Sequence, residues 1–289
     1  MASEWCIGII GGSGLYNIEG LEDEQWIAIE TPWGDPSDEI LCGRLGDVKV
    51  RFLPRHGRGH PVSPSELNSR ANIDALKRAG CTDILAISAV GSLREEIEPG
   101  RFAVVEQFID RTTARQNTFF PSGFVTHVSM ADPVCERLSE MAAKAIQACK
   151  GKVAVGATYV AIEGPQFSTR AESRLYRHWG ADVIGMTAMP EARLAREAEL
   201  PYALIGMATD YDCWREGEAV DVAQVIAQMQ ANSELARDMI AKFVTSLPKK
   251  RKPSPIDTAL DDAVITAPDE HDPAVLARLD AVAGRLFED

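Results

Sequence analysis

The sequence lacks the features that mark membrane, secreted and metal-binding proteins. None of its apolar stretches approaches the roughly 20 residues that a helix needs to span a bilayer. The N-terminus carries no basic region followed by an apolar stretch, which is the pattern of a secretory signal. The six cysteines are scattered, without a CxxC pair or a metal-type spacing, as in proteins of a reducing compartment. We therefore expect a cytoplasmic protein with no membrane partner.

Several motifs of nucleotide-binding and hydrolytic enzymes are also missing. The glycine-rich stretch at 11–14 does not continue as GxGxxG, because Asn17 stands where the third glycine belongs. No GxxxxGK[ST], GxSxG or HExxH occurs. His56 and His60 have a spacing that could bind a metal on a helix, but the glycines around them disfavour a helix. We therefore expect no metal and interpret His56 as either a structural group or an anion contact.

Positive charge is in short supply. The sequence has 30 basic and 43 acidic side chains, which gives a formal net charge of −13. Nucleic-acid binding requires a basic footprint, so we expect no nucleic-acid partner. A few local donors can still bind a small anion.

The length of 289 residues suits one large α/β domain or two small ones.

Strand-like and helix-like segments alternate along the chain, which predicts an α/β fold: a single domain with a twisted central mixed β-sheet flanked by helices. The patterns predict strands over residues 5–10, 48–53, 83–89, 153–161, 182–186 and 202–208. They predict helices over residues 63–79, 132–148, 169–179 and 220–246, the first and third opened by capping boxes at Ser63 and Thr169.

The end of the chain differs in character from the rest. We expect a catalytic domain over residues 1–247 and, over 248–289, a linker and C-terminal extension of unknown role. The basic run at 249–252 is typical of a solvated segment. Residues 274–287 have the pattern of a short terminal helix.

Polar groups follow several of the predicted strands. Ser13, Arg55, Ser88 and Thr187 all stand at or near strand ends, where ligands of open α/β proteins bind. Glycines beside Ser13 would let backbone N–H groups approach an anion, and the Arg55 fork suits a phosphate. Together these groups describe a site for one small oxyanion.

Two carboxyl groups end the last predicted strand. Asp210 and Asp212 follow the apolar stretch at 202–208 and are flanked by aromatic residues. A carboxyl group in an aromatic-walled pocket can hold a raised pKa and then donate a proton. The alternative is a surface turn, because aspartate is common in turns.

Seven motifs then establish a resemblance. They run in order from about residue 6 to about residue 246: IGIIGGSGL at 7–15, PRHGRGH at 54–60, AVGSLREE at 89–96, QFIDRTT at 107–113, EGPQFS at 163–168, WGADVI at 179–184 and ATDYDCW at 208–214. With them the chain resembles the trimeric nucleoside phosphorylases, most closely the branch that cleaves 5′-methylthioadenosine.

The resemblance assigns roles to residues of this chain. It implies a phosphate site of Ser13, Arg55, His56, Ser88, Ala89 and Thr187. It implies nucleoside contacts at Phe167, Ser168, Met186, Asp210, Asp212, His127, Val222, Val225 and Ile226. Asp210 and His56 are its catalytic candidates, and His127 would reach the active site of a neighbouring subunit of a homotrimer. Val222, Val225 and Ile226 also fit simple core positions on an amphipathic helix.

The reaction that the resemblance implies is phosphorolysis. Inorganic phosphate, a co-substrate rather than a cofactor, attacks C1′ of methylthioadenosine, and adenine leaves. The related enzymes for 6-oxopurines carry asparagine where this chain has Asp210, so we expect a preference for 6-aminopurines. A 6-oxopurine phosphorylase, a nucleosidase that uses water and a non-catalytic nucleotide-binding module are the alternatives.

The sequence departs from the family pattern at four positions and in the region past Pro248, which does not match it. Ser13 and Ser88 stand where threonine is usual, Val90 stands where close relatives have cysteine, and Gly185 stands where a polar residue can occur. Both serines keep the hydroxyl group that a phosphate contact needs.

Overall fold

A computed structural model describes residues 4–12, 14–215 and 220–287 of the chain. The strands are β1 (Cys6–Gly11), β2 (Leu21–Ile27), β3 (Ile40–Leu45), β4 (Val48–Pro54), β5 (Asp83–Ser92), β6 (Phe102–Arg111), β7 (Val153–Ile162), β8 (Val183–Gly185) and β9 (Tyr202–Asp210). The α-helices are α1 (Ser69–Arg78), α2 (Glu136–Ala148), α3 (Arg170–His178), α4 (Ala188–Glu197), α5 (Val222–Thr245), α6 (Pro273–Arg278) and α7 (Asp280–Ala283).

The strands form one mixed sheet that is partly closed into a barrel. One half has the open order β2-β3-β4-β1-β5. From β5 the order β8-β7-β6-β9 leads back to β5, so that five strands form a ring. The pairs β1–β4, β1–β5 and β5–β9 are parallel, whereas β3–β4, β5–β8 and β6–β9 are antiparallel. The prediction of a mixed sheet is therefore confirmed.

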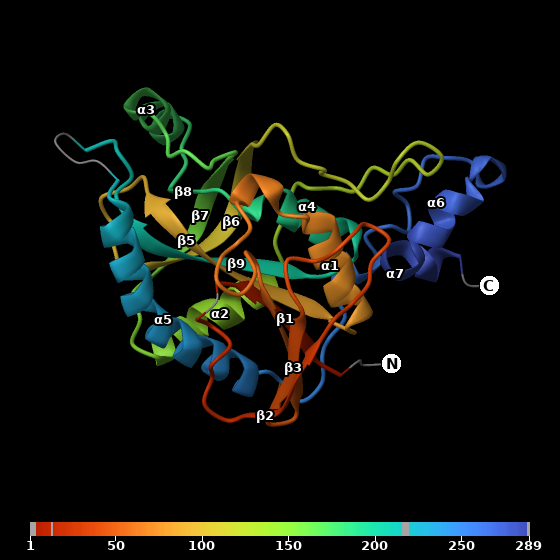
Figure 1. The fold of residues 1–289 in the computed structure, drawn as a ribbon, viewed down its shortest axis with the longest axis horizontal. Helices are drawn as coiled ribbons and strands as arrows, with labels where there is room; N and C mark the ends of the chain where they lie inside the picture. Colours follow the sequence, from red (N-terminus) through yellow and green to blue (C-terminus); the bar gives the residue numbers. More distant parts are fainter. Residues whose placement is uncertain (1–3, 13, 216–219, 288–289) are drawn as a thin grey trace.

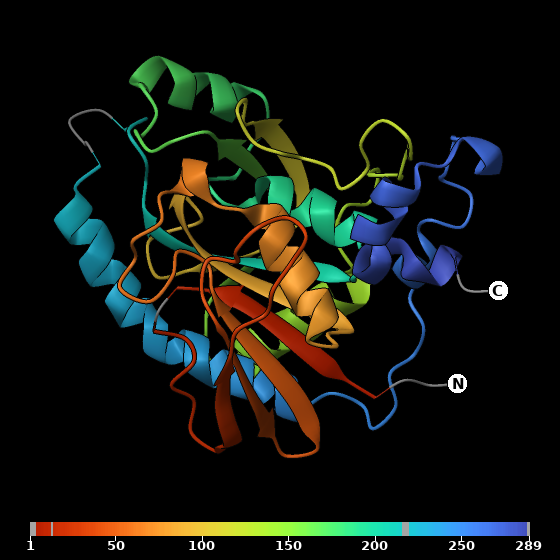
Figure 2. The ribbon, with the colours of Figure 1, turned by 45° about the vertical axis from the view of Figure 1, so that its right-hand side comes forward.

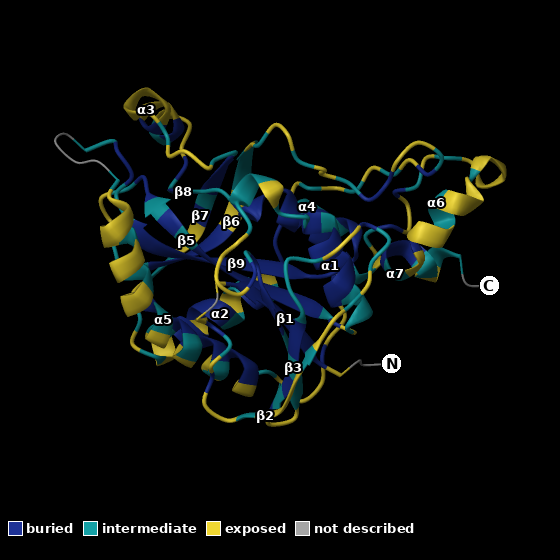
Figure 3. Cartoon of the chain, in the orientation of Figure 1, coloured by how far each residue is buried: buried dark blue, intermediate teal, exposed yellow. Residues whose placement is uncertain are grey.

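Helices cover both faces of the sheet (Figures 1 and 2). Neighbouring residues on β1 show why both faces need a cover. Ile9 belongs to the core cluster that includes Phe243 of α5, and Ile10 belongs to the cluster that includes Leu194 of α4. The sheet is accordingly buried throughout its centre, whereas α3 and the outer side of α5 are exposed (Figure 3).

All six strands predicted from the sequence are present, but three strands and one helix were not predicted. β2 has the sequence LEDEQWI and is mostly exposed, so it lacks an apolar signal. The short strand β3 contains glycine and arginine, which obscure its period. β6 was noted only as a motif, and α4 begins directly after the site residue Thr187.

The predicted helix over residues 63–79 is interrupted, and its predicted cap is wrong. The side chain of Ser63 makes no capping bond to the backbone and donates instead to Glu66 Oε2 at 2.7 Å. A single 3-10 turn ends before Asn68, whose side chain accepts from the Ala71 N–H and starts α1. The capping box at Thr169, in contrast, is confirmed, since Thr169 and Glu172 exchange both bonds at the start of α3.

The helix α5 does not present one continuous buried face. Met239, Ile240 and Phe243 in its second half are buried in the core. In its first half, Val222 and Ile226 are 57% and 46% exposed.

The segment after residue 247 packs against the rest of the chain rather than trailing into solvent. Arg251 is 5% exposed and donates to the fully buried Asp83 from Nε at 2.5 Å, so the prediction of a solvated basic run is wrong for this residue. Leu260, Leu279 and Val282 join the core beside α1 and α4. The division into a catalytic domain and an extension at residue 247 stays a prediction. Among the described helices, none combines the length and apolar character that a bilayer crossing demands.

Candidate active site

A cavity of about 530 Å³ opens at the carboxyl ends of β1, β4, β5 and β9. Two parallel registers create it: Gly11 pairs with Pro54, and Ser88 pairs with Gly206, so the residues that follow these strands lie side by side. The cavity contains most of the residues proposed from the sequence: Arg55, His56, Ser88, Ala89, Phe167, Ser168, Met186, Thr187, Asp210, Asp212 and Val225.

Four predicted site residues remain, and three of them do not line the cavity. Ser13 lies outside the described residues. His127 is exposed on the loop after β6, where its backbone N–H donates to the Ala263 carbonyl at 2.8 Å. Val222 and Ile226 stand on the exposed side of α5. The assignments of these four residues stay predictions.

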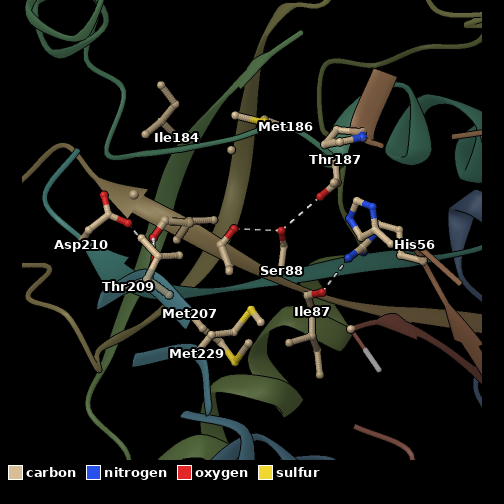
Figure 4. Close-up of a pocket in the computed structure, with 18 of the residues that line it drawn as sticks. His56, Ile87, Ser88, Ile184, Met186, Thr187, Met207, Thr209, Asp210 and Met229 are labelled. Carbon is tan, nitrogen blue, oxygen red and sulfur yellow. Dashed lines mark hydrogen bonds between the residues drawn. The ribbon is translucent and has the colours of Figure 1, made fainter. Parts of the chain in front are cut away.

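Hydroxyl groups converge at one end of the cavity. Ser88 Oγ and Thr187 Oγ1 are 3.1 Å apart and share a hydrogen bond, and Ser88 also donates to the Ala89 carbonyl at 3.1 Å. Figure 4 shows both hydroxyl groups beside His56, with Asp210 on the opposite side of the pocket. Each hydroxyl group can rotate to donate to a ligand oxygen, which suits this end to an oxyanion.

Arg55 is fully enclosed by fixed partners. Its Nε and Nη2 contact the two oxygens of Glu191 at 2.8 and 3.0 Å, and its Nη1 donates to the Ile87 carbonyl at 2.7 Å. Tyr202 donates to the same Glu191 carboxylate at 2.8 Å. Burial alone would lower the pKa of Arg55, but the Glu191 carboxylate outweighs burial and raises it. Arg55 is therefore always charged and rigid, and the Glu191 carboxylate balances its charge.

His56 is a neutral ring at neutral pH. Burial lowers its pKa to about 4, against the bond to the Val62 carbonyl and with further lowering by Arg55 and His60. His60 stacks on His56 with ring centroids 4.2 Å apart. The Val62 carbonyl, 2.9 Å from Nδ1, can only accept, so Nδ1 carries the proton.

Asp210 is anchored at both oxygens. Its Oδ1 accepts from the Asp212 backbone N–H at 2.7 Å, and its Oδ2 is 2.7 Å from Thr209 Oγ1. The Thr209 hydroxyl is also 3.2 Å from the Val90 carbonyl. Burial raises the pKa of Asp210, while the Thr209 and Asp212 bonds oppose the rise.

Asp212 adds a second buried carboxyl group with unused capacity. Its backbone has φ of 52°, a left-handed conformation that costs energy in a residue other than glycine. Its Oδ2 is buried and has no hydrogen-bond partner among the described residues. Gly91 makes room for this arrangement, because a Cβ there would lie 3.1 Å from Asp210 Oδ1. The buried Ser173 hydroxyl lies close to this carboxyl group and opposes the rise in pKa that burial causes, and a ligand N–H can donate to the same carboxyl group.

Apolar side chains separate the two polar ends. Met186 stands on one side, and Met207 and Met229 on the other, as Figure 4 shows. Met229 follows Val225 by one helical turn of α5, so both face the cavity.

Tyr159 explains the glycine at position 185. A Cβ on Gly185 would lie 2.1 Å from Tyr159 Oη, so the buried tyrosine fills the space that a side chain would take. The Tyr159 hydroxyl accepts from the Thr187 backbone N–H at 3.4 Å. The buried tyrosine on β7 therefore occupies the space beside Gly185.

Sequence reasoning missed three residues that organise the site. Glu191 holds Arg55, and Thr209 holds Asp210. Arg115 donates to the carbonyls of Met186 and Met189 at 2.6 and 2.7 Å and pairs with Glu163, which ties together the two loops beside the apolar section. No local signal marks Glu191 or Arg115, whereas Thr209 lies next to Asp210 and its hydroxyl could have been considered.

The fold and the cavity define the class of the protein. An oxyanion end with hydroxyl and guanidinium groups faces a pair of buried carboxyl groups across an apolar section, at the rim of a partly closed mixed sheet. The model of the phosphorylase superfamily matches residues 6–245, so the chain belongs to this superfamily.

Individual relatives narrow the comparison. The chain is 56% identical over 286 residues to the S-methyl-5′-thioadenosine phosphorylase of Cereibacter sphaeroides, covering 98% of each sequence, and 50% identical to that of Bradyrhizobium diazoefficiens, covering 97% and 98%. A methylthioadenosine phosphorylase structure from an antarctic soil metagenomic library superposes with a TM-score of 0.90 at 44% identity, covering 96% of this chain and 99% of the other. The enzyme from Schistosoma mansoni, in complex with adenine, superposes with a TM-score of 0.76 at 40% identity, covering 83% and 91%.

Proposed function

We propose that the protein cleaves the N-glycosidic bond of 5′-methylthioadenosine with inorganic phosphate, giving adenine and 5-methylthioribose 1-phosphate for purine and methionine salvage. The single observation that carries the proposal is the cavity itself. It joins an oxyanion end at Ser88 and Thr187 to a base end at Asp210 and Asp212, with an apolar section between them. The names of the near full-length relatives agree with this substrate.

The phosphate end of the cavity supplies position rather than a protein nucleophile. A phosphate oxygen forms the new bond to C1′ while the bond from C1′ to N9 of adenine breaks. Ser88, Thr187 and the one N–H of Arg55 that is left by its bonds to Glu191, Ile87 and Ile10 would hold the phosphate against the sugar. Holding the two reactants in contact removes much of the entropic barrier of a bimolecular reaction.

Asp210 is the proposed acid for the leaving base. Adenine leaves readily only when N7 gains a proton or a strong hydrogen bond, and a protonated Asp210 can supply either. The Thr209 hydroxyl fits both forms of Asp210: it donates to the carboxylate, and it can accept from the protonated group while it donates to the Val90 carbonyl. The same carboxyl group can accept from the 6-amino group, and the unpartnered Oδ2 of Asp212 offers a further acceptor.

The residues that line the cavity predict two substrate preferences. A 6-oxopurine presents an acceptor where the carboxyl groups expect a donor, and such a mismatch can cost ~10⁴ in kcat/KM. The methylthio group suits the apolar section with Val225 and Met229, but one methyl-sized difference contributes only ~1–3 kcal/mol. Adenosine should therefore be a poorer substrate that is still accepted.

The proposal includes assembly and location. We infer a homotrimer in which His127 reaches the cavity of a neighbouring subunit, because His127 is exposed and does not line the cavity of its own chain. A cytoplasmic location stays a prediction from the cysteine pattern.

The test is adenine release from 5′-methylthioadenosine with and without phosphate, with methylthioinosine in parallel. We expect release that depends on phosphate, and little product from methylthioinosine. Activity mainly on methylthioinosine would indicate a 6-oxopurine phosphorylase. Release without phosphate would indicate a nucleosidase, and binding without turnover a non-catalytic module.

A further inference from the structure

The hydrogen bonds of His56 decide which ring nitrogen can meet a ligand. Nδ1 lies 2.9 Å from the Val62 carbonyl, which accepts and never donates, so Nδ1 carries the hydrogen. His56 lines the cavity, and Nε2 is the ring nitrogen left for a ligand. In the neutral ring Nε2 is an acceptor. A ligand atom that meets it must therefore bring a hydrogen.

The surroundings of His56 favour the neutral ring. Arg55 precedes it in sequence, and His60 stacks on it at 4.2 Å. The Glu191 carboxylate is committed to Arg55 and Tyr202, and it cancels the Arg55 charge rather than that of a His56 cation. Consistent with this, burial lowers the pKa of His56 to about 4.

The oxyanion end consequently carries little net charge for an anion to meet. Among the described residues that line the cavity, Arg55 is the only lysine or arginine, and Glu191 pairs with it through both oxygens. Arg237 of α5 lies near the glycine-rich loop, but its Nη1 is held by the Gly14 carbonyl at 3.0 Å. What remains for the anion among the described residues is a set of N–H and O–H donors, together with the acceptor Nε2 of His56.

We propose that His56 acts as a hydrogen-bond acceptor that selects an oxyanion carrying a hydrogen, so that phosphate binds through a P–OH group donated to Nε2. This inference rests on the proposed phosphate-dependent function and specifies the form of the phosphate. No covalent bond changes in this step, because the hydrogen stays on the phosphate oxygen. The bond polarises that oxygen and leaves more negative charge on the phosphate that attacks C1′.

The proposal separates phosphate from sulfate, which has the same shape. Phosphate keeps at least one hydrogen between pH 6 and 8, whereas sulfate keeps none. Sulfate can bind only if a proton from solvent first converts His56 to its cation. Its apparent inhibition constant should therefore rise by about tenfold for each pH unit, as expected for uptake of one proton. Phosphate, which supplies its own hydrogen, should show a much smaller change.

The experiment is calorimetric titration of the full-length protein with sulfate and with phosphate at pH 7, in two buffers with different ionisation enthalpies. We expect sulfate to take up about one proton more per bound anion than phosphate. In His56→Gln, whose amide can turn an N–H towards the anion, this difference should disappear. The matched control is His60→Gln, which removes the stacked ring and keeps the acceptor, and it should retain the difference.

Equal proton uptake by the two anions, or a difference that survives in His56→Gln, would overturn the proposal. So would a sulfate affinity that stays constant between pH 6 and 8, because sulfate has no hydrogen to donate to the neutral ring. The measurement needs no turnover. If sulfate takes up more protons than phosphate but no adenine is released with phosphate, the proposed function fails and the acceptor role of His56 stands. If adenine is released but the two anions take up equal numbers of protons, the proposed function stands and the acceptor role fails.

Discussion

At the scale of single residues, the chemistry of the base depends on Asp210. In Asp210→Asn the amide keeps the shape and the contact to the Asp212 N–H but cannot deliver a proton to N7. We expect kcat for methylthioadenosine to fall by ~10²–10⁴, the usual scale of general acid catalysis. Steady-state kinetics with methylthioadenosine and methylthioinosine would measure it.

The control for this substitution is Thr209→Val, which leaves the carboxyl group and removes only its hydroxyl partner. Because burial raises the pKa of Asp210 and the Thr209 bond opposes the rise, the pKa should increase further in Thr209→Val. The alkaline limb of the pH–rate profile should then move to higher pH. Full activity of Asp210→Asn would contradict its role as the acid.

A second prediction at the scale of single residues concerns Glu191, whose replacement should lower the free energy of unfolding. Glu191→Gln replaces one of the two acceptors facing Arg55 with a donor and leaves the buried guanidinium charge uncompensated. Breaking such a pair costs about 3–5 kcal/mol of unfolding free energy. Phosphate can replace the lost counter-charge, so we expect phosphate to raise the Tm of Glu191→Gln more than that of the parent in thermal unfolding.

Tyr202→Phe is the companion variant, because it removes a neutral partner of Glu191 and leaves the ion pair intact. Its response to phosphate should match that of the parent. An equal response of Glu191→Gln and the parent would show that Glu191 does not balance the charge at the phosphate end.

The sequence predicted the residues that contact a ligand better than it predicted the residues that hold them in place. Arg55, Asp210 and Asp212 stand at strand ends, so the general rule for α/β proteins places them together. Glu191 is 136 positions from Arg55, and no periodicity connects the two. Long-range partners of this kind are decided by tertiary packing, which one sequence does not reveal.

At the scale of elements, the loop after β6 is held by a glutamate at the end of α4. Both oxygens of the buried Glu197 accept, from Thr118 Oγ1 at 2.8 Å and from the Phe119 N–H at 2.7 Å. Burial raises its pKa to about 7, against these two bonds and the nearby Arg193. The Glu197 carboxyl group is therefore partly protonated near neutral pH.

The raised pKa of Glu197 makes the free energy of unfolding depend on pH. Between pH 4.5, the ordinary value for glutamate, and pH 7, the folded state holds a proton that the unfolded state has lost, so stability decreases as pH rises. The effect is on the order of 3 kcal/mol. In Glu197→Gln we expect this loss to vanish, measured as the unfolding free energy in urea at pH 5 and pH 8. The exposed Glu140→Gln is the control, and a decrease that persists in Glu197→Gln would contradict the argument.

Elements were predictable where burial leaves a clear period. β5 and β9 are apolar runs between polar residues, and the pattern located both. β2 is exposed on both sides and exists because β3 pairs with it, and this pairing leaves no trace in its own sequence. The start of α1 moved from Ser63 to Asn68 because the Ser63 side chain bonds to Glu66 instead of the backbone.

At the scale of the whole molecule, the C-terminal segment is part of the folded structure. Arg251 bonds to Asp83 and Asp257, and Arg137 is the second partner of Asp83. We expect Arg251→Gln to lower the unfolding free energy in urea by about 3 kcal/mol, at the low end for a buried pair because Arg137 remains. Lys250→Gln, the exposed neighbour, should change it by less than about 0.5 kcal/mol. Equal effects would mean that the segment contributes little.

The proposed trimer can be tested by mixing subunits. If His127 acts across a subunit boundary, a trimer that combines Asp210→Asn and His127→Ala subunits contains cavities with both residues intact. Unfolding and refolding the two variants together should then give more activity than the sum of each refolded alone. If His127 acts within its own chain, mixing should give no gain.

The bond between Arg251 and Asp83 also bears on how the chain is made. The two residues are 168 positions apart, and Asp83 leaves the ribosome first. At translation rates of roughly 5–20 residues per second, Arg251 follows about 10–30 s later. During that interval the amino end of β5 lacks at least one of its two counter-charges, and the core beside α1 lacks Leu260 and Leu279. The final closure of the fold thus waits for the last sixth of the chain, so a prematurely released product would be left open to proteases.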